Sequence, residues 1–120
     1  MRTLHLATVF AAATLLTLTG CSSSSPKAAT DVQVSPAPGQ QATYLAALNA
    51  IDPEIVNGKD DKAISRGLDQ CTAMKTETNP NRRVTQVEER FISPHHPGGF
   101  GPAKSSLILG AVQKNLCPTL

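Results

Sequence analysis

Three cysteines are the residues of this 120-residue chain that most clearly indicate chemistry. The first of them ends the tetrapeptide Leu18-Thr19-Gly20-Cys21, which has the form of a lipobox. At such a signal, bacteria attach a diacylglyceryl group to the cysteine thiol and cleave the chain before that cysteine. We therefore predict that Cys21 is lipidated and that cleavage falls between Gly20 and Cys21. An ordinary secretory signal that leaves no lipid is the alternative, although no clear Ala-x-Ala site follows the apolar run.

The other two cysteines, Cys71 and Cys117, are left over once Cys21 carries a lipid. In an oxidising compartment two remaining thiols predict one disulfide. This bridge would close a loop of about 45 residues, for which chain entropy predicts a stabilisation of about 4 kcal/mol. A redox-active pair is the alternative, but such pairs are usually close in sequence, as in Cys-x-x-Cys.

His95 and His96 form a histidine pair within a loop rich in proline and glycine. Imidazoles bind metals, and these two residues are the candidates for a metal site. A zinc site needs three or four protein ligands, however, and no other histidine follows residue 21. We therefore predict an exposed loop and neither metal nor cofactor.

Two further clusters carry charge. Arg82, Arg83 and Arg90 could touch anionic lipid headgroups, but a solvated helix N-terminus is the preferred interpretation. Asp60 and Asp61 are expected to cap a helix, because the helix macrodipole favours negative charge there. No Gly-x-Ser-x-Gly motif and no pairing of a free cysteine with histidine is present, so we predict no catalytic residues and no enzyme.

The overall charge argues against nucleic-acid binding. The formal net charge is +2, and removing residues 1–20 takes away Arg2 and no acidic residue, which leaves +1. This is too little for a chain that must contact many phosphates without sequence preference. Aromatic residues are few, so the core must consist mainly of aliphatic side chains.

The composition divides the chain into three parts. Residues 1–20 are predicted to be a lipoprotein signal peptide, whose apolar run is too short to span a bilayer. Residues 21–40, rich in serine, proline and alanine, are predicted to be the lipidated cysteine and a disordered tether. Residues 41–120 are predicted to form a small helical domain.

Apolar periodicity in the third part predicts an all-α bundle of about four short helices, with no strand. The predicted helices cover residues 41–51, 60–74, 84–92 and 102–116, with a helical turn or loop at residues 54–56. Residues 76–83 are expected to form a polar turn. Gly67 lies inside the second helix, where a close helix crossing would explain its presence.

Three motifs of the predicted domain together resemble a known family; they are Tyr44-Leu45-Ala46-Ala47-Leu48, Gly67-Leu68-Asp69-Gln70-Cys71, and Ile108-Leu109 through Leu116-Cys117-Pro118. The chain resembles, over residues 43–118, the small exported actinobacterial proteins of domain-of-unknown-function family 732, and among them a lipoprotein subgroup. The resemblance implies a small helical fold with one disulfide, and it implies no activity.

These observations predict an extracytoplasmic lipoprotein, held at the cell membrane by a diacylglyceryl group on Cys21. We expect a non-enzymatic interaction or accessory module that binds a partner protein or another envelope component, an envelope protein being one such partner. The alternative is a protein that binds a small ligand or a metal through the loop from Ser93 to Pro102. A small hydrolase is the least favoured hypothesis.

Overall fold

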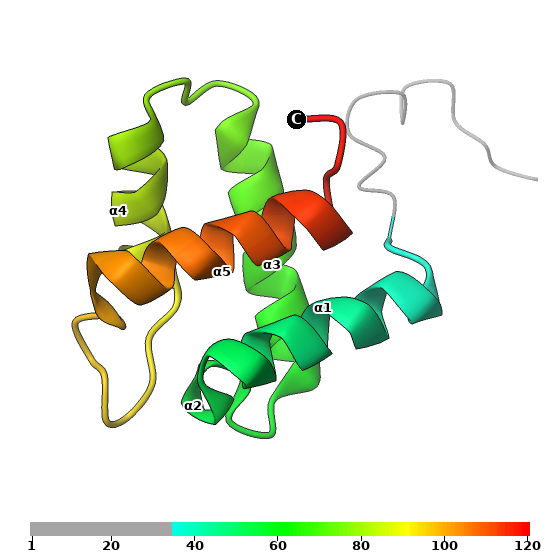
Figure 1. Cartoon of the computed structure of the whole chain (residues 1–120), viewed down its shortest axis with the longest axis vertical. Coiled ribbons are helices and arrows are strands. Elements are labelled where there is room, and N and C mark those ends of the chain that lie inside the picture. Colours follow the sequence, from blue (N-terminus) through cyan, green and yellow to red (C-terminus); the bar gives the residue numbers. More distant parts are fainter. Residues whose placement is uncertain (1–34) are drawn as a thin grey trace, which may run out of the picture. The chain divides into compact units, whose positions relative to one another are not determined.

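The computed structural model describes residues 35–120 (Figure 1). The predicted signal peptide, the lipidation site at Cys21 and most of the predicted tether lie outside the described residues. Within them the chain forms five helices, which are α1 (Pro38–Ile51), α2 (Pro53–Val56), α3 (Asp60–Met74), α4 (Pro80–Arg90) and α5 (Gly101–Asn115). The described part has no strand beyond one isolated bridge between Ser93 and His96. The predicted all-α fold is confirmed.

Helix α1 begins three residues earlier than predicted, inside the segment that the composition assigned to the tether. Pro38 occupies the first turn, where its missing N–H group is harmless. The Gln40 side chain accepts a hydrogen bond from the Ala37 N–H at 3.0 Å. The helix ends at Ile51 as predicted, because Pro53 forces Asp52 into an extended conformation.

Of the two predictions for residues 54–56, a helical turn or a loop, the helical turn is correct, since these residues lie in the four-residue helix α2 (Pro53–Val56). Asp52 caps it by accepting a hydrogen bond from the Glu54 N–H at 2.9 Å. Asn57 and Gly58 end it with φ values of 51° and 66°, a left-handed conformation that asparagine and glycine tolerate best.

Helix α3 has the predicted bounds, but the predicted cap is wrong. Lys59 occupies the cap position, and its side chain makes no capping hydrogen bond. Asp60 and Asp61 lie in the first turn instead, where their carboxylates still interact favourably with the helix macrodipole.

Helix α4 covers residues that were divided between a predicted polar turn and a helix at residues 84–92. It begins four residues earlier because Asn79 is a strong cap, accepting hydrogen bonds from the N–H groups of Asn81 at 2.9 Å and Arg82 at 3.3 Å. Its last residue is Arg90, since Phe91 is already extended.

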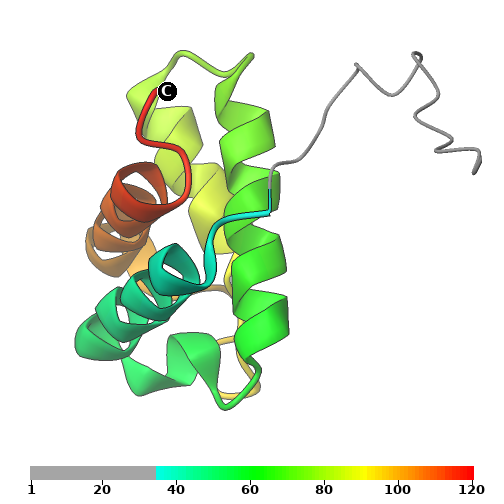
Figure 2. The ribbon, with the colours of Figure 1, turned by 90° about the vertical axis from the view of Figure 1, so that its right-hand side faces the viewer.

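The helices form two layers. Helices α1 and α5 pack side by side and cross over α3 and α4, as the two views show (Figure 1 and Figure 2). Fully buried side chains fill the space between the layers, among them Tyr44, Leu48, Met74, Val87, Phe91, Ile108 and Val112. The core is mainly aliphatic, but two of the few aromatic rings lie at its centre.

A close helix crossing at Gly67 is confirmed. A Cβ atom at this position would lie 2.4 Å from Leu116 Cδ1 and 2.6 Å from Tyr44 Oη, so even alanine would force these side chains to shift. The Tyr44 hydroxyl lies against α3 and donates a hydrogen bond to the Ala63 carbonyl at 3.2 Å. Burial raises the pKa of Tyr44 well above its ordinary value, which keeps the hydroxyl protonated as a donor.

The predicted disulfide is present. Cys71 near the end of α3 is bonded to Cys117 just after α5, with a Cα–Cα distance of 6.0 Å. Both cysteines are buried. The bridge therefore joins the two layers near the C-terminal end of α3.

Candidate functional site

The predicted histidine loop lies against α2, and Glu54 is the residue that connects them. Glu54 Oε1 is 3.0 Å from His95 Nδ1, and Glu54 Oε2 is 3.5 Å from His96 Nε2. The Ser93 hydroxyl donates a hydrogen bond to Glu54 Oε2 at 3.4 Å. One carboxylate thus binds three side chains of the loop.

The loop has a defined shape of its own. Ser93 and His96 exchange two backbone hydrogen bonds, at 3.2 and 3.0 Å. Gly99 has a φ of 91°, and a Cβ there would lie 2.4 Å from the Glu88 carbonyl oxygen, so the loop packs closely on α4. The His96 ring lies 4.5 Å from the Phe100 ring, centroid to centroid. The loop is therefore packed against the rest of the domain and held by its own hydrogen bonds.

The two histidines differ in exposure. His95 is 79% exposed, as predicted, whereas His96 is 37% exposed and packs on Phe100. Within residues 35–120, no group of three or more histidine, cysteine, aspartate or glutamate side chains is arranged to hold a metal ion. Among residues 35–120, the Ser93 hydroxyl is hydrogen-bonded to the Glu54 carboxylate and to the His96 backbone N–H, and to no imidazole.

A groove lies between the loop and the start of α3. It has a volume of about 280 Å³. Its apolar lining comes from Ile55 and Val56 of α2 and from loop residues Ile92, Pro94 and Pro97. Lys59, Lys62 and Arg66 also line it, against a single carboxylate, that of Glu54. The sequence analysis identified the loop but not the three cationic residues that face it.

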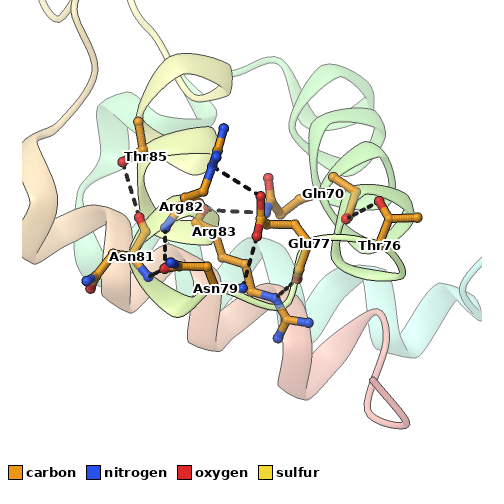
Figure 3. Close-up of polar contacts among 9 residues, drawn as sticks. Gln70, Thr76, Glu77, Asn79, Asn81, Arg82, Arg83 and Thr85 are labelled. Atoms are coloured by element: carbon orange, nitrogen blue, oxygen red, sulfur yellow. Dashed lines mark hydrogen bonds and ion pairs between the residues drawn. The ribbon is translucent and has the colours of Figure 1, made fainter.

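Two members of the arginine cluster, Arg83 and Arg90, are half-buried and hydrogen-bonded to the chain itself, which corrects the prediction of a solvated helix N-terminus. Arg83 donates a hydrogen bond to the carbonyl oxygen of Glu77 at 2.5 Å (Figure 3). It also reaches back to α3 and donates to the carbonyl oxygen of Met74 at 2.9 Å. These carbonyls follow or end the helix and have no partner within it. Only Arg82 matches the prediction, since it is 75% exposed and forms an ion pair with Glu77 at 3.3 Å.

Arg90, the third member of the cluster, donates a hydrogen bond to Gln70 Oε1. Gln70 is fully buried, and its side-chain amide also donates to the Arg83 carbonyl at 3.5 Å. The sequence analysis missed Gln70. Its position next to Cys71, three residues after Gly67, places it near the buried side of α3, and that periodicity was the available signal.

Another ion pair joins α5 to the junction of α1 and α2. Lys104 of α5 donates a hydrogen bond to Asp52 Oδ2 at 2.6 Å. The hydrogen bond from Lys104, and then that from the Glu54 N–H, hold the pKa of Asp52 below its ordinary value of 3.8. Asp52 therefore both caps α2 and fixes the junction of α1 and α2 against α5.

The exposed surface of α1 and α5 carries little charge, and its exposed charged residue is Lys114 in the last turn of α5. Helix α1 contains no acidic or basic residue. The residues that we call the α1–α5 face are all exposed and uncharged; they are Ala42, Ala46, Asn49, Ala50, Ala103, Ser106, Leu107 and Gly110. Leu107 is 59% exposed and is the most exposed large apolar residue of the described part.

Comparison with known protein families, with curated proteins and with solved structures finds no match to this chain. Over residues 35–120, no helix is both long and apolar enough to cross a membrane.

Proposed function

We propose that this protein is a lipid-anchored, non-enzymatic accessory protein of the bacterial envelope, and that it binds a partner protein through the α1–α5 face. The observation that carries the proposal is an exposed leucine, Leu107, among small uncharged side chains on two packed helices; the exposed charged residue of these helices is Lys114, in the last turn of α5. Small side chains let another helix approach closely. An uncharged face offers no electrostatic gain to a charged partner, so the expected partner surface is itself uncharged.

The membrane anchor is supported by the cysteine pairing. Cys71 and Cys117 are bonded to each other, so neither is available to Cys21. A lipobox cysteine is consumed by a thioether, which accounts for an odd number of cysteines in an exported chain. The likeness to family 732 stays a proposal that rests on the three motifs quoted for it.

Labelling of cells with an alkyne analogue of palmitate tests the anchor. We expect the wild-type chain to be labelled and to sediment with membranes. We expect Cys21→Ser to lose both properties. Equal labelling of the two chains would place any acyl group elsewhere and refute the predicted site.

Crosslinking in intact cells tests the partner. A photoreactive amino acid at position 107 is expected to capture an envelope protein, whereas one at the exposed position 69 of α3 is not. Ala46→Glu places a charge on the α1–α5 face and should abolish capture from position 107. Thr85→Glu is the matched control on exposed α4 surface. Recovery of the protein alone from position 107 would refute this function.

A second function, the binding of a small ligand beside the loop from Ser93 to Pro102, is favoured by the groove. Its volume of about 280 Å³ lies near the lower end of the range for small-molecule sites. Apolar walls with a few polar groups are also typical of such sites. The test is titration of the full chain with small molecules, followed through the backbone amide signals of the groove residues.

A further inference from the structure

We propose that the groove binds a small amphiphilic anion, meaning a carboxylate or phosphate group joined to a short apolar chain or ring. The proposal rests on the second function, the binding of a small ligand, and makes no use of the α1–α5 face. It assigns the charge and the shape of the ligand from the residues that line the groove.

Three cations lie along one side of the groove. Lys59, Lys62 and Arg66 are spaced three and four residues apart, so they lie on one face at the start of α3. Lys59 and Lys62 are exposed, and neither has a side-chain hydrogen bond or ion pair with any residue in 35–120. Arg66 donates one hydrogen bond, to the Ile92 carbonyl at 3.1 Å, which leaves further N–H donors on its guanidinium.

The single carboxylate of the lining is already occupied. Both oxygens of Glu54 contact the loop, one at His95 and the other at His96 and Ser93. The acidic residues at the start of α3, Asp60 and Asp61, do not line the groove. The charge that the groove presents to a ligand is therefore positive, and an anion is complementary to it.

Much of the remaining lining of the groove is apolar. Ile55 and Val56 are buried there, and Ile92 is 41% exposed although it is a large apolar side chain. Pro94 and Pro97 complete this wall. Removing Ile92 from water would favour a ligand with an apolar body. An inorganic anion would contact the cations but would leave the apolar residues of the lining exposed to water.

The experiment uses the full chain carrying Cys21→Ser, as recovered after export, so that no attached lipid competes for the groove. The probes are octyl phosphate, octanoate, octyl glucoside and inorganic phosphate, each kept below its micelle concentration. Binding is followed by backbone amide shifts. Anionic vesicles and neutral vesicles form a separate arm, which distinguishes a lipid headgroup from a free amphiphile as the source of the same chemistry.

We expect octyl phosphate and octanoate to shift signals of residues 54–66 and 92–97 and to bind about tenfold more tightly than octyl glucoside, the equivalent of about 1.4 kcal/mol. Inorganic phosphate should bind more weakly than octyl phosphate. Lys62→Gln should weaken octyl phosphate several-fold, and Ile92→Ser should weaken it while preserving the folded spectrum. Lys114→Gln removes the same charge from exposed α5 surface and should change nothing.

Equal binding of octyl phosphate and octyl glucoside would refute the anion assignment and leave the ligand-binding function standing. Equal binding by wild type and Lys62→Gln would do the same. Shifts that map outside the groove, or no shift with any probe, would overturn both. Binding of anionic vesicles with no binding of the free amphiphiles would replace the small ligand by a lipid headgroup and so overturn the proposal as stated.

Discussion

At the C-terminal end of α3, arginine side chains turn inward and bind carbonyl and amide oxygens, whereas at its N-terminal end lysine side chains extend into solvent beside an apolar groove. Arg83 and Arg90 are engaged with the chain itself, through Met74, Glu77 and Gln70. The side chains of Lys59 and Lys62 have no hydrogen bond or ion pair with any described residue. Positive charge holds the fold together at one end and is available to a ligand at the other.

The difference follows from what each end must satisfy. A helix C-terminus leaves carbonyl groups without partners, and the forked guanidinium of arginine can bind two of them. A helix N-terminus leaves N–H groups, which lysine cannot satisfy. The first turn of α3 instead carries Asp60 and Asp61, so Lys59 and Lys62 remain available. The lysines at the start of α3 are therefore better candidates for ligand contacts than the arginines bound at its end.

Removing the disulfide near the C-terminal end of α3 should have the largest effect on stability. We expect Cys71→Ser to lower the free energy of unfolding by about 4 kcal/mol, because the unfolded chain regains the freedom of the closed loop. This loss rivals the whole stability of so small a domain. Urea denaturation followed by circular dichroism measures it. Cys117→Ser should match it, and two reactive thiols in the native wild-type chain would contradict the bridge.

Neighbouring arginines provide the sharpest test of the comparison. Arg83→Met should cost about 1.5–3 kcal/mol of unfolding free energy, since two carbonyl oxygens lose charge-assisted hydrogen bonds. Arg82→Met removes the same charge at the neighbouring position, where the side chain is exposed. It should change the free energy of unfolding by less than about 0.5 kcal/mol. Equal effects in urea denaturation would show that charge and not the inward contacts matters at this end.

The groove lysines should behave in the opposite way. Lys59→Gln and Lys62→Gln are expected to change the unfolding free energy by less than about 0.5 kcal/mol, because neither side chain has a partner among the described residues. The measurement is the same urea titration. A loss comparable to that of Arg83→Met would mean that these lysines hold the fold, and the contrast between the two ends would disappear.

Acid should produce the smallest effect, at the ion pair beside the groove. The pKa of Asp52 is lowered in the fold, so the pair with Lys104 stabilises the protein above the ordinary aspartate value of 3.8. That contribution is lost as the pH falls through the lowered pKa. The difference in urea midpoint between wild type and Lys104→Met should therefore be present at neutral pH and shrink in acid. A difference that stays constant with pH would contradict the role of the Asp52 charge.

Much of the fold could be predicted because it depends on local patterns. The bounds of α3, the end of α1 at Asp52 and the left-handed stop at Asn57 all follow from residues next to them in the chain. The start of α4 could not be placed from apolar periodicity, since its first turn is polar and is set by the cap at Asn79. The start of α1 was misplaced for a similar reason.

The candidate site was predicted only in part. The loop with His95 and His96 could be recognised from its composition, and Gly67 indicated a close crossing that the fold contains. The cations that face the loop could not be found, because Lys59 and Arg66 lie about 30 residues away in sequence and meet it only through packing. The inward direction of Arg83 and Arg90 was hidden for the same reason.

By itself the sequence determined the helical class, the pairing of Cys71 with Cys117 and the prediction of a lipid anchor at Cys21, because each depends on periodicity, on cysteine count or on a short local motif. The tertiary structure decided which polar residues are used by the fold. Gln70 and Arg90 are joined inside it, Glu54 is held by the histidine loop, and Lys62 is left beside an apolar wall. Side-chain direction depends on contacts between distant segments, and composition does not record those contacts.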